Sequence, residues 1–247
     1  MVICWRRPSW FAVLLTLLGI AFFVRLGVWQ LHRASYKEQL LAQFAEANKA
    51  PLKPFAKVSD KISSISFAHV QVTGRFLLRH RYLLDDQFVK NQYGVQVLAP
   101  FRVLGRSRFL LVDLGFVAHG HKRRNIPRLP TLPTGVIRLR GLYTAPPAAG
   151  LELGGNQLAK QTDWPKLTTY LKMGQVERDL GQPLFPGVLL SDPEPSTPYL
   201  RIWTPSFVPP ARHQAYALQW FTFAMAALVI FLSMHLRRVS PKDGQNE

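Results

Sequence analysis

The sequence predicts a membrane protein in which two transmembrane helices flank a mainly antiparallel β (α+β) periplasmic domain. Residues 216–234 carry no charged side chain, and residues 10–24 form a second uncharged run behind a basic N-terminus. About 20 apolar residues cross a hydrocarbon core as a helix, because every backbone amide then finds its partner inside the segment. Between the two runs the pattern of apolar residues changes to the period of two that is typical of strands.

The C-terminal run is predicted to be a membrane span over residues 213–235. A buried helix of a soluble protein usually keeps a polar stripe, whereas this run has only Gln219, Thr222 and Ser233. The N-terminal span is predicted over residues 9–29. No small-x-small cleavage site follows it, so an uncleaved anchor is favoured over a signal peptide.

The short basic tails set the expected orientation. Residues 1–8 carry Arg6 and Arg7, and residues 236–247 carry Arg237, Arg238 and Lys242. Basic tails stay in the cytoplasm, so residues 30–212 are predicted to be periplasmic. The expected location is a bacterial inner (cytoplasmic) membrane, because nine residues before the first span leave no room for a mitochondrial presequence.

The composition narrows the class of function. The chain of 247 residues has a net charge of +17 and 48% hydrophobic residues, and its one cysteine, Cys4, allows neither an internal disulfide nor a CxxC motif. The cations of the middle segment are scattered and not gathered on one recognition helix, and a periplasmic domain meets no genome. We therefore expect no nucleic acid as a partner, and expect membrane lipid headgroups, propionates or an acidic protein face as the counter-charge.

The middle segment is predicted to be one β-rich domain that starts with a helical continuation of the first span, over residues 31–48. A further helix is expected from Asp163, as N-cap, to Gly181. Eight prolines between 183 and 210 predict an extended segment with one short strand at 200–203. The other strands are expected at residues 67–76, 81–84, 95–103, 108–117 and 136–143, with 95–117 forming a hairpin.

Motifs for catalysis are missing, and no catalytic residue is predicted. Asp85 and Asp86 are adjacent, so a turn is favoured over a paired acid and base. His119 and His121 precede three cations and have no third ligand nearby, which favours an exposed loop over a metal site.

Two stretches at the predicted outer membrane boundary are more informative. Helical spacing places Gln30, Arg33 and Lys37 on one face of the first helix, and His213, Tyr216 and Trp220 on one face of the second. If the spans are neighbours, a histidine, aromatic rings and cations converge just outside the hydrocarbon. The alternative is an ordinary aromatic belt with a histidine that faces the headgroups.

The residues of these stretches carry a resemblance. The chain resembles the surfeit locus protein 1 family of cytochrome c oxidase assembly factors over nearly its whole length, with one departure, since Leu114 stands where that family usually has an arginine. The residues that carry the resemblance are Gly27-x-Trp29-Gln30-Leu31-x-Arg33-x-x-x-Lys37, His213-x-x-Tyr216-Ala217-x-Gln219-Trp220-Phe221, Val70-x-Val72-x-Gly74-x-Phe76 and Gly94-x-x-Val97-x-x-Pro100.

The resemblance implies a non-enzymatic assembly factor for a haem-copper (cytochrome c) oxidase that assists insertion of haem a into subunit I. The implied partners are cytochrome c oxidase subunit I and the haem a synthesis machinery, and the implied cofactor is transient haem a. A neutral imidazole suits haem iron, aromatic rings suit the porphyrin, and cations suit its propionates. The expected binding residues are His213 as iron ligand, with His32 ranked second, Tyr216 and Trp220 beside the ring, and Arg33, Lys37 and Arg212 for the propionates.

Two other classes of function stay open from the residues alone. A membrane-anchored periplasmic enzyme would need convergent acid and base groups in the β domain, which the sequence does not show. A purely structural oxidase-associated subunit would pack against oxidase helices through the small residues Ala217, Ala224, Ala226 and Ala227. His69 and His80 are expected on the surface of the β domain.

Overall fold

The computed structural model describes residues 2–5, 7–57, 67–119, 126–146, 158–194, 197–201, 205 and 208–239. The chain divides into two units. One unit consists of Met1–Leu41 and Ser206–Glu247, and the other of Ala42–Pro205.

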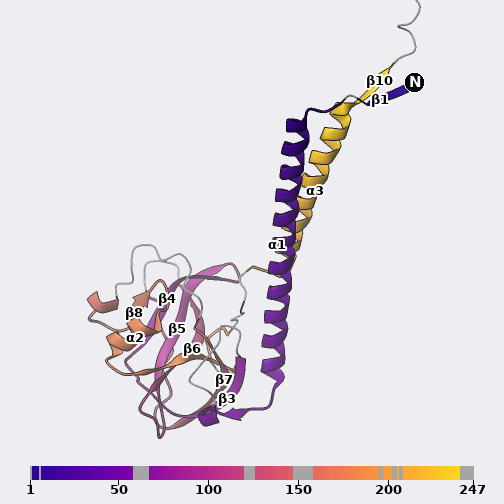
Figure 1. Cartoon of the computed structure of the whole chain (residues 1–247). Coiled ribbons are helices and arrows are strands. Elements are labelled where there is room, and N and C mark those ends of the chain that lie inside the picture. Colours follow the sequence, from indigo (N-terminus) through magenta and orange to yellow (C-terminus); the bar gives the residue numbers. More distant parts are fainter. Residues whose placement is uncertain are drawn as a thin grey trace, which may run out of the picture. The chain divides into compact units, whose positions relative to one another are not determined.

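Two long helices make up most of the first unit. Helix α1 covers Trp10–Lys49 and helix α3 covers Pro210–His235, and both are long and apolar enough to cross a membrane. The prediction that the first span continues as a helix to just before Pro51 is confirmed, because no proline or glycine interrupts residues 28–49. The two helices run antiparallel and side by side (Figure 1).

Small residues line the seam between α1 and α3. Gly27 and Ala34 are buried on α1, and Ala217 and Ala224 are buried on α3. The spacing of seven on each helix keeps these residues on one face, and their size lets the helix backbones approach closely. Ala217 and Ala224 therefore pack inside the chain's own helix pair, whereas the alternative of a purely structural subunit had them facing oxidase helices.

The chain segments beyond the two helices form a short ladder. Strand β1 (Val2–Trp5) pairs antiparallel with strand β10 (Leu236–Val239), with Val2 opposite Val239. From the sequence, only basic tails were expected at both ends of the chain. The antiparallel helices bring both tails to the same end of the pair, which is what allows them to hydrogen-bond.

The second unit is built on one sheet. In the described residues its strand order is β2-β3-β7-β9-β6-β5-β4-β8, with parallel pairing only at β2–β3, β4–β8 and β6–β9. The mainly antiparallel β domain is therefore confirmed. The strands are β2 (Lys53–Pro54), β3 (Phe67–Phe76), β4 (Tyr82–Val89), β5 (Gln92–Val103), β6 (Phe109–Ala118), β7 (Ile137–Thr144), β8 (Lys166–Thr168) and β9 (Leu184–Ser191), with 3₁₀ turns η1 (Phe55–Lys57) and η2 (Leu158–Lys160).

Strand β3 closes part of this sheet into a barrel. It pairs with β7 from Phe67 to Gly74 and with β5 from Gly74 to Phe76, so β3, β7, β9, β6 and β5 form a ring. Gly74 lies where the two pairings meet, and a Cβ there would come within 2.1 Å of the Arg102 carbonyl oxygen. Only glycine allows the two backbones to approach this closely.

Alternate side chains of the ring strands fill two apolar cores. On β6, Leu110 and Val112 belong to the cluster that contains Phe101, whereas Leu111 belongs to the cluster that contains Val176. Val176 lies on helix α2 (Met173–Leu180), which covers the second cluster. Strand β6 is buried on both faces for this reason, and its near-continuous apolar sequence follows from it.

The helix predicted from Asp163 to Gly181 is correct only in its second half. Residues Lys166–Thr168 form strand β8, which pairs in parallel with Tyr82–Leu84 of β4, and α2 begins at Met173. Gly181 ends the helix with a left-handed backbone at φ +64°, as expected. The apolar residues 167 and 171 fit the period of a helix and also that of a strand. The edge of β4 offers a pairing partner here, so residues 166–168 form a strand.

The prediction of an extended, mostly unpaired segment from residue 183 was wrong for its first part. Strand β9 lies inside the ring between β6 and β7. Its Pro186 is exposed at the place where the β6–β9 register shifts between Phe109 and Leu111. A proline is tolerated at such an irregularity because no ladder hydrogen bond is required of it there. Leu200 forms an antiparallel bridge with Phe116, and residues 202 and 203 of the expected short strand lie outside the described residues.

Two expectations about polar residues of the β domain also change. Asp85 and Asp86 lie in a bulge of β4, not in a turn, because the register shifts between Leu84 and Gln87 and Asp86 has φ +56°. His119 contacts Asp85 through Nε2 and Oδ1 at 3.4 Å, while His121 lies outside the described residues. Within the described residues no group of three potential metal ligands is found.

His69 and His80, which were expected on the surface, are half-buried. The His69 ring contacts the carbonyl oxygen of Ala50 and Oδ2 of Asp192, each at 3.0 Å. Burial would lower the pKa of His69, but these two contacts outweigh it and raise the pKa. The His80 ring packs 4.5 Å from the Trp164 ring, and burial together with the nearby Lys166 charge lowers its pKa.

Candidate functional site

His213 is held by a residue from the other helix. It lies in the first turn of α3, and its Nδ1 is 2.8 Å from Oε1 of Gln30 on α1. When Nδ1 donates to this oxygen, the lone pair of the neutral imidazole lies on Nε2. A buried or half-buried histidine whose Nδ1 proton is fixed in this way is the usual form of a metal-ligating histidine.

Trp220 lies two turns further along the same face of α3. Its ring stacks on Phe23 of α1, with centroids 6.0 Å apart and planes 21° from parallel. The neighbouring Phe221 ring lies against Gly27, where a Cβ would come within 2.6 Å of it. Trp220 is therefore part of the packed seam between the helices and is half-buried there.

The remaining predicted site residues are more exposed. Tyr216 is 47% exposed, and Arg212, His32 and Arg33 are also exposed, whereas Lys37 is half-buried. The Arg33 guanidinium and the Lys37 ammonium both lie near the Tyr36 ring, at 6.0 and 5.9 Å from its centroid. The two cations are thus held on one aromatic ring at the same end of the helix pair as His213.

The structure brings His213 together with α1, but it divides the predicted set into two parts. His213 and Trp220 face the seam, while Tyr216 and most of the cations face outward. Sequence reasoning missed the partners that position these groups. Gln30 was placed on a face with Arg33 and Lys37 but was given no role, and the pair Gln214 Nε2 to Glu38 Oε1, at 2.8 Å, was not predicted.

Strand β6 contains Leu114, which stands where the resembled family usually has an arginine, and it also carries the buried polar residue Asp113. The carboxylate of Asp113 accepts hydrogen bonds from Gln96 Nε2 at 2.6 Å and from the Gly115 amide at 2.9 Å. Burial raises the pKa of Asp113 to about 6, against the lowering effect of these bonds and of the Arg201 charge. Leu114 itself lies in the apolar core, and its carbonyl oxygen accepts a hydrogen bond from Arg201 Nε at 3.0 Å.

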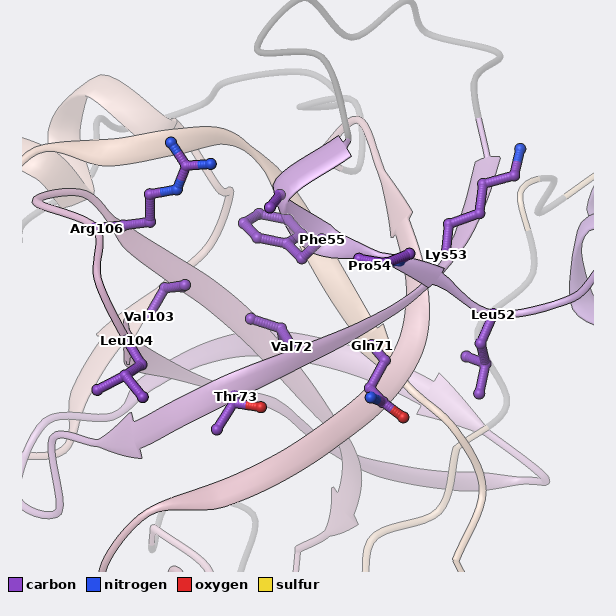
Figure 2. Close-up of a pocket in the computed structure, with 11 residues that line it drawn as sticks. Leu52, Lys53, Pro54, Phe55, Gln71, Val72, Thr73, Val103, Leu104 and Arg106 are labelled. Atoms are coloured by element: carbon purple, nitrogen blue, oxygen red, sulfur yellow. The ribbon is translucent and has the colours of Figure 1, made fainter.

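A cavity of about 390 Å³ lies in the β domain beside strand β3. Figure 2 shows Lys53 and Arg106 at its two ends, with Phe55 between them. Its floor includes Gln71 and Thr73 of β3, and its described lining contains neither a carboxylate nor a histidine. The lining can bind an anionic or neutral polar group, but it offers no acid and base pair.

These features define the class of the protein. It is a two-span membrane protein in which two long apolar helices flank a mainly antiparallel β domain with a helix packed on it. The model of the SURF1 family matches residues 17–225, which is most of the chain, so the chain belongs to the SURF1 family.

A curated relative agrees with this assignment. The chain is 31% identical over 132 residues to a SURF1-like protein of Monosiga brevicollis. The match covers 47% of this chain and 48% of that protein, so the chain spans about half the length of the relative that it matches.

Proposed function

We propose that this chain is an assembly factor for a haem-copper (cytochrome c) oxidase and that it assists insertion of haem a into subunit I. In this proposal it is not an enzyme, and it holds haem a transiently at the outer end of the helix pair. Membership of the SURF1 family supports the role in oxidase assembly. The observation that carries the haem proposal is the contact between His213 and Gln30.

The residues present fit a haem in part. When His213 Nδ1 donates to Gln30, Nε2 is the nitrogen that remains for haem iron. Arg33 and Lys37 lie one to two turns beyond Gln30 on α1 and supply cations for propionates. Arg212 is the neighbour of His213 in sequence and supplies a third. Trp220 already stacks on Phe23, so Tyr216 is the more accessible ring.

The test is an absorption spectrum of the detergent-solubilised protein purified from cells that also make haem a. His213→Ala is expected to abolish or shift the haem spectrum, and Gln30→Ala to weaken haem binding about tenfold or more, as is typical when the partner of a ligating histidine is removed. His235→Ala is the matched control, because His235 lies on the same helix at its other end and bonds to the Phe231 carbonyl. An unchanged spectrum in His213→Ala and in the His32→Ala, His213→Ala double variant would end the haem proposal.

The location that goes with this function is a bacterial inner membrane with the β domain in the periplasm and both tails in the cytoplasm. The basic residues on both tails support this orientation. A reporter that is active only in the periplasm should work when fused after Pro146 and should be silent when fused after Val239. The opposite pattern would invert the orientation.

A further inference from the structure

A second cavity in the β domain forms where strand β9 ends. Strand β7 is paired with β3 along its whole length, but β9 covers only Gly141–Thr144 of its other edge. Residues Ile137–Arg140 therefore extend past the end of β9. Beyond Ser191 the chain leaves the sheet, and Leu200 returns to bridge Phe116 of β6, with backbone bonds of 2.8 and 3.0 Å.

The gap between β7 and this returning segment is a cavity of about 490 Å³. This size lies in the range of small-ligand sites and exceeds that of a single water or ion. The residues that line it are Arg138, Leu139, Arg140, Ser191, Asp192, Pro193, Glu194 and Arg201.

Three guanidinium groups converge on the cavity from two directions. Arg138 and Arg140 alternate along β7 and are both exposed on one face, about 7 Å apart along the strand. Opposite them on β3 stand the neutral residues Thr73 and Gln71. Neither arginine has an ion-pair partner within the part of the chain that the structure describes, so their mutual repulsion is not relieved by a carboxylate.

Arg201 approaches from the returning segment and is fixed in place. Its Nε donates to the Leu114 carbonyl oxygen at 3.0 Å, and its Nη1 donates to the Asp192 carbonyl oxygen. The guanidinium is thus held in the lining of the cavity by backbone oxygens, and the charges of Glu194, Asp192 and Asp113 act on it. A fixed guanidinium loses little entropy when it binds a planar or tetrahedral oxyanion.

Two carboxylates also line the cavity, and one of them is already engaged. Asp192 Oδ2 contacts His69 Nε2 at 3.0 Å, and the Asp192 amide donates to the Arg140 carbonyl oxygen at 3.0 Å. Glu194 is exposed at the rim. The three arginines therefore leave an excess of positive charge in the cavity.

The Ser191 hydroxyl is not expected to contact a ligand, although Ser191 lines the cavity. Ser191 is paired with Gly141, so its side chain lies on the opposite face of the sheet from Arg138 and Arg140. Its hydroxyl oxygen is buried and has no hydrogen-bond partner among the described residues.

We propose that this cavity binds a small anionic ligand through a carboxylate or phosphate group, with Arg138 and Arg140 as the main contacts and Arg201 as a fixed third contact. Guanidinium groups bind both kinds of oxyanion with paired hydrogen bonds. The site lies in the β domain and is independent of the haem proposal.

The experiment is a calorimetric titration of the full chain, purified without haem in a non-ionic detergent at low salt, with inorganic phosphate and separately with succinate. Wild-type protein is expected to bind at least one of the two probes, and Arg138→Gln and Arg140→Gln are each expected to weaken that binding about tenfold. Ser191→Ala should leave it unchanged, because the Ser191 side chain lies on the opposite face of the sheet from the two arginines. The probe that binds more tightly identifies the group as phosphate or carboxylate.

Arg102→Gln is the matched control, because Arg102 is an exposed arginine on strand β5 outside the cavity. It removes the same charge and should leave binding within twofold of wild type. The proposal fails if wild-type protein binds neither probe, if Arg138→Gln and Arg140→Gln bind as tightly as wild type, or if Arg102→Gln weakens binding equally. None of these outcomes affects the haem spectrum, so the two proposals fail separately.

Discussion

The helix pair and the β domain are each stabilised internally by a different kind of contact. Between α1 and α3 the contacts are small residues and rings, as at Gly27 against Phe221, and the polar pair Gln214–Glu38 is exposed. In the β domain, charged groups are buried with their partners, as in the pair Lys166–Asp179. The difference teaches that shape decides the fit of the helices, whereas electrostatic pairing decides part of the stability of the β domain.

The largest expected effect concerns the buried pair that joins β8 to α2. Lys166 Nζ lies 2.6 Å from Asp179 Oδ1, with both side chains at most 10% exposed, and the Tyr82 hydroxyl donates to Asp179 Oδ2 at 2.9 Å. Asp179→Ala leaves a buried ammonium without a partner and should lower the free energy of unfolding of the β domain by about 3–5 kcal/mol. Urea denaturation of the full chain in detergent, followed by the β-sheet circular dichroism signal, measures this.

Asp179→Ala has a matched control in Glu177→Ala, on the same helix. Glu177 is exposed and accepts one bond, from the Leu184 amide at 2.9 Å. Its removal should cost about 1 kcal/mol. Equal losses in the two variants would show that the buried pair contributes no more than a surface contact.

The second effect is a pH dependence that belongs to the β domain. Because burial raises the pKa of Asp113 to about 6, the folded state binds its proton more tightly than the unfolded state. The stability contributed by this group is therefore present at about pH 4 and is lost as the pH rises to about 6, by about 3 kcal/mol. His69, whose pKa is also raised, contributes in the same direction.

The variant Asp113→Asn separates the contribution of Asp113 to the pH dependence from that of His69. The variant keeps an oxygen that accepts the Gly115 amide, but it cannot ionise. Thermal unfolding of the full chain between pH 4 and 7 should show a flatter profile in Asp113→Asn than in wild type. A profile as steep as that of wild type would mean that Asp113 stays ionised in the folded protein.

The smallest expected effect tests the shape of the helix seam. Gly27→Ala places a Cβ within 2.6 Å of the Phe221 ring and should destabilise the pair by about 1–3 kcal/mol. Because the obstacle is a side chain, Phe221→Leu in the same chain should restore part of the loss. Thermal unfolding in detergent of the single and double variants measures the coupling.

Gly74→Ala provides the contrast within the β domain. Its Cβ would meet the Arg102 carbonyl oxygen at 2.1 Å, which no shortening of a side chain can relieve. Phe101→Leu, which trims the other nearby group, should therefore not rescue it. Rescue at Gly74, or no rescue at Gly27, would break the comparison between the two regions.

Much of the fold could be predicted from local patterns. The strand at 67–76, the hairpin within 95–117 and the strand near 136–143 all alternate clearly, and each forms as a strand. The patterns predicted the wrong element where the helix and strand periods fitted the same residues. They also failed where a high proline content concealed a strand. Residues 166–168 joined the open edge of β4 as a strand, and Pro186 was placed at a bulge inside β9.

The candidate site was predicted less completely than the fold. The two boundary motifs pointed to His213 and Trp220, but helical spacing cannot show which side of a helix faces its neighbour. The structure turned His213 toward Gln30 and left Tyr216 outward, because Ala217 and Ala224 set the contact face of α3. His69 and Asp192, which are distant in sequence, were brought together only because β3 and β9 pair with the two edges of β7.

The sequence by itself determined the two apolar helices, the basic tails and the alternation of the main strands, because length, charge and period act locally along the chain. Only the tertiary structure decided the ring of five strands among the described residues, the partner of His213 and the cavity that three arginines line. These depend on which strand edges and helix faces meet. Gln30 and His213, which are 183 positions apart, then share one contact, and no local pattern records such a meeting.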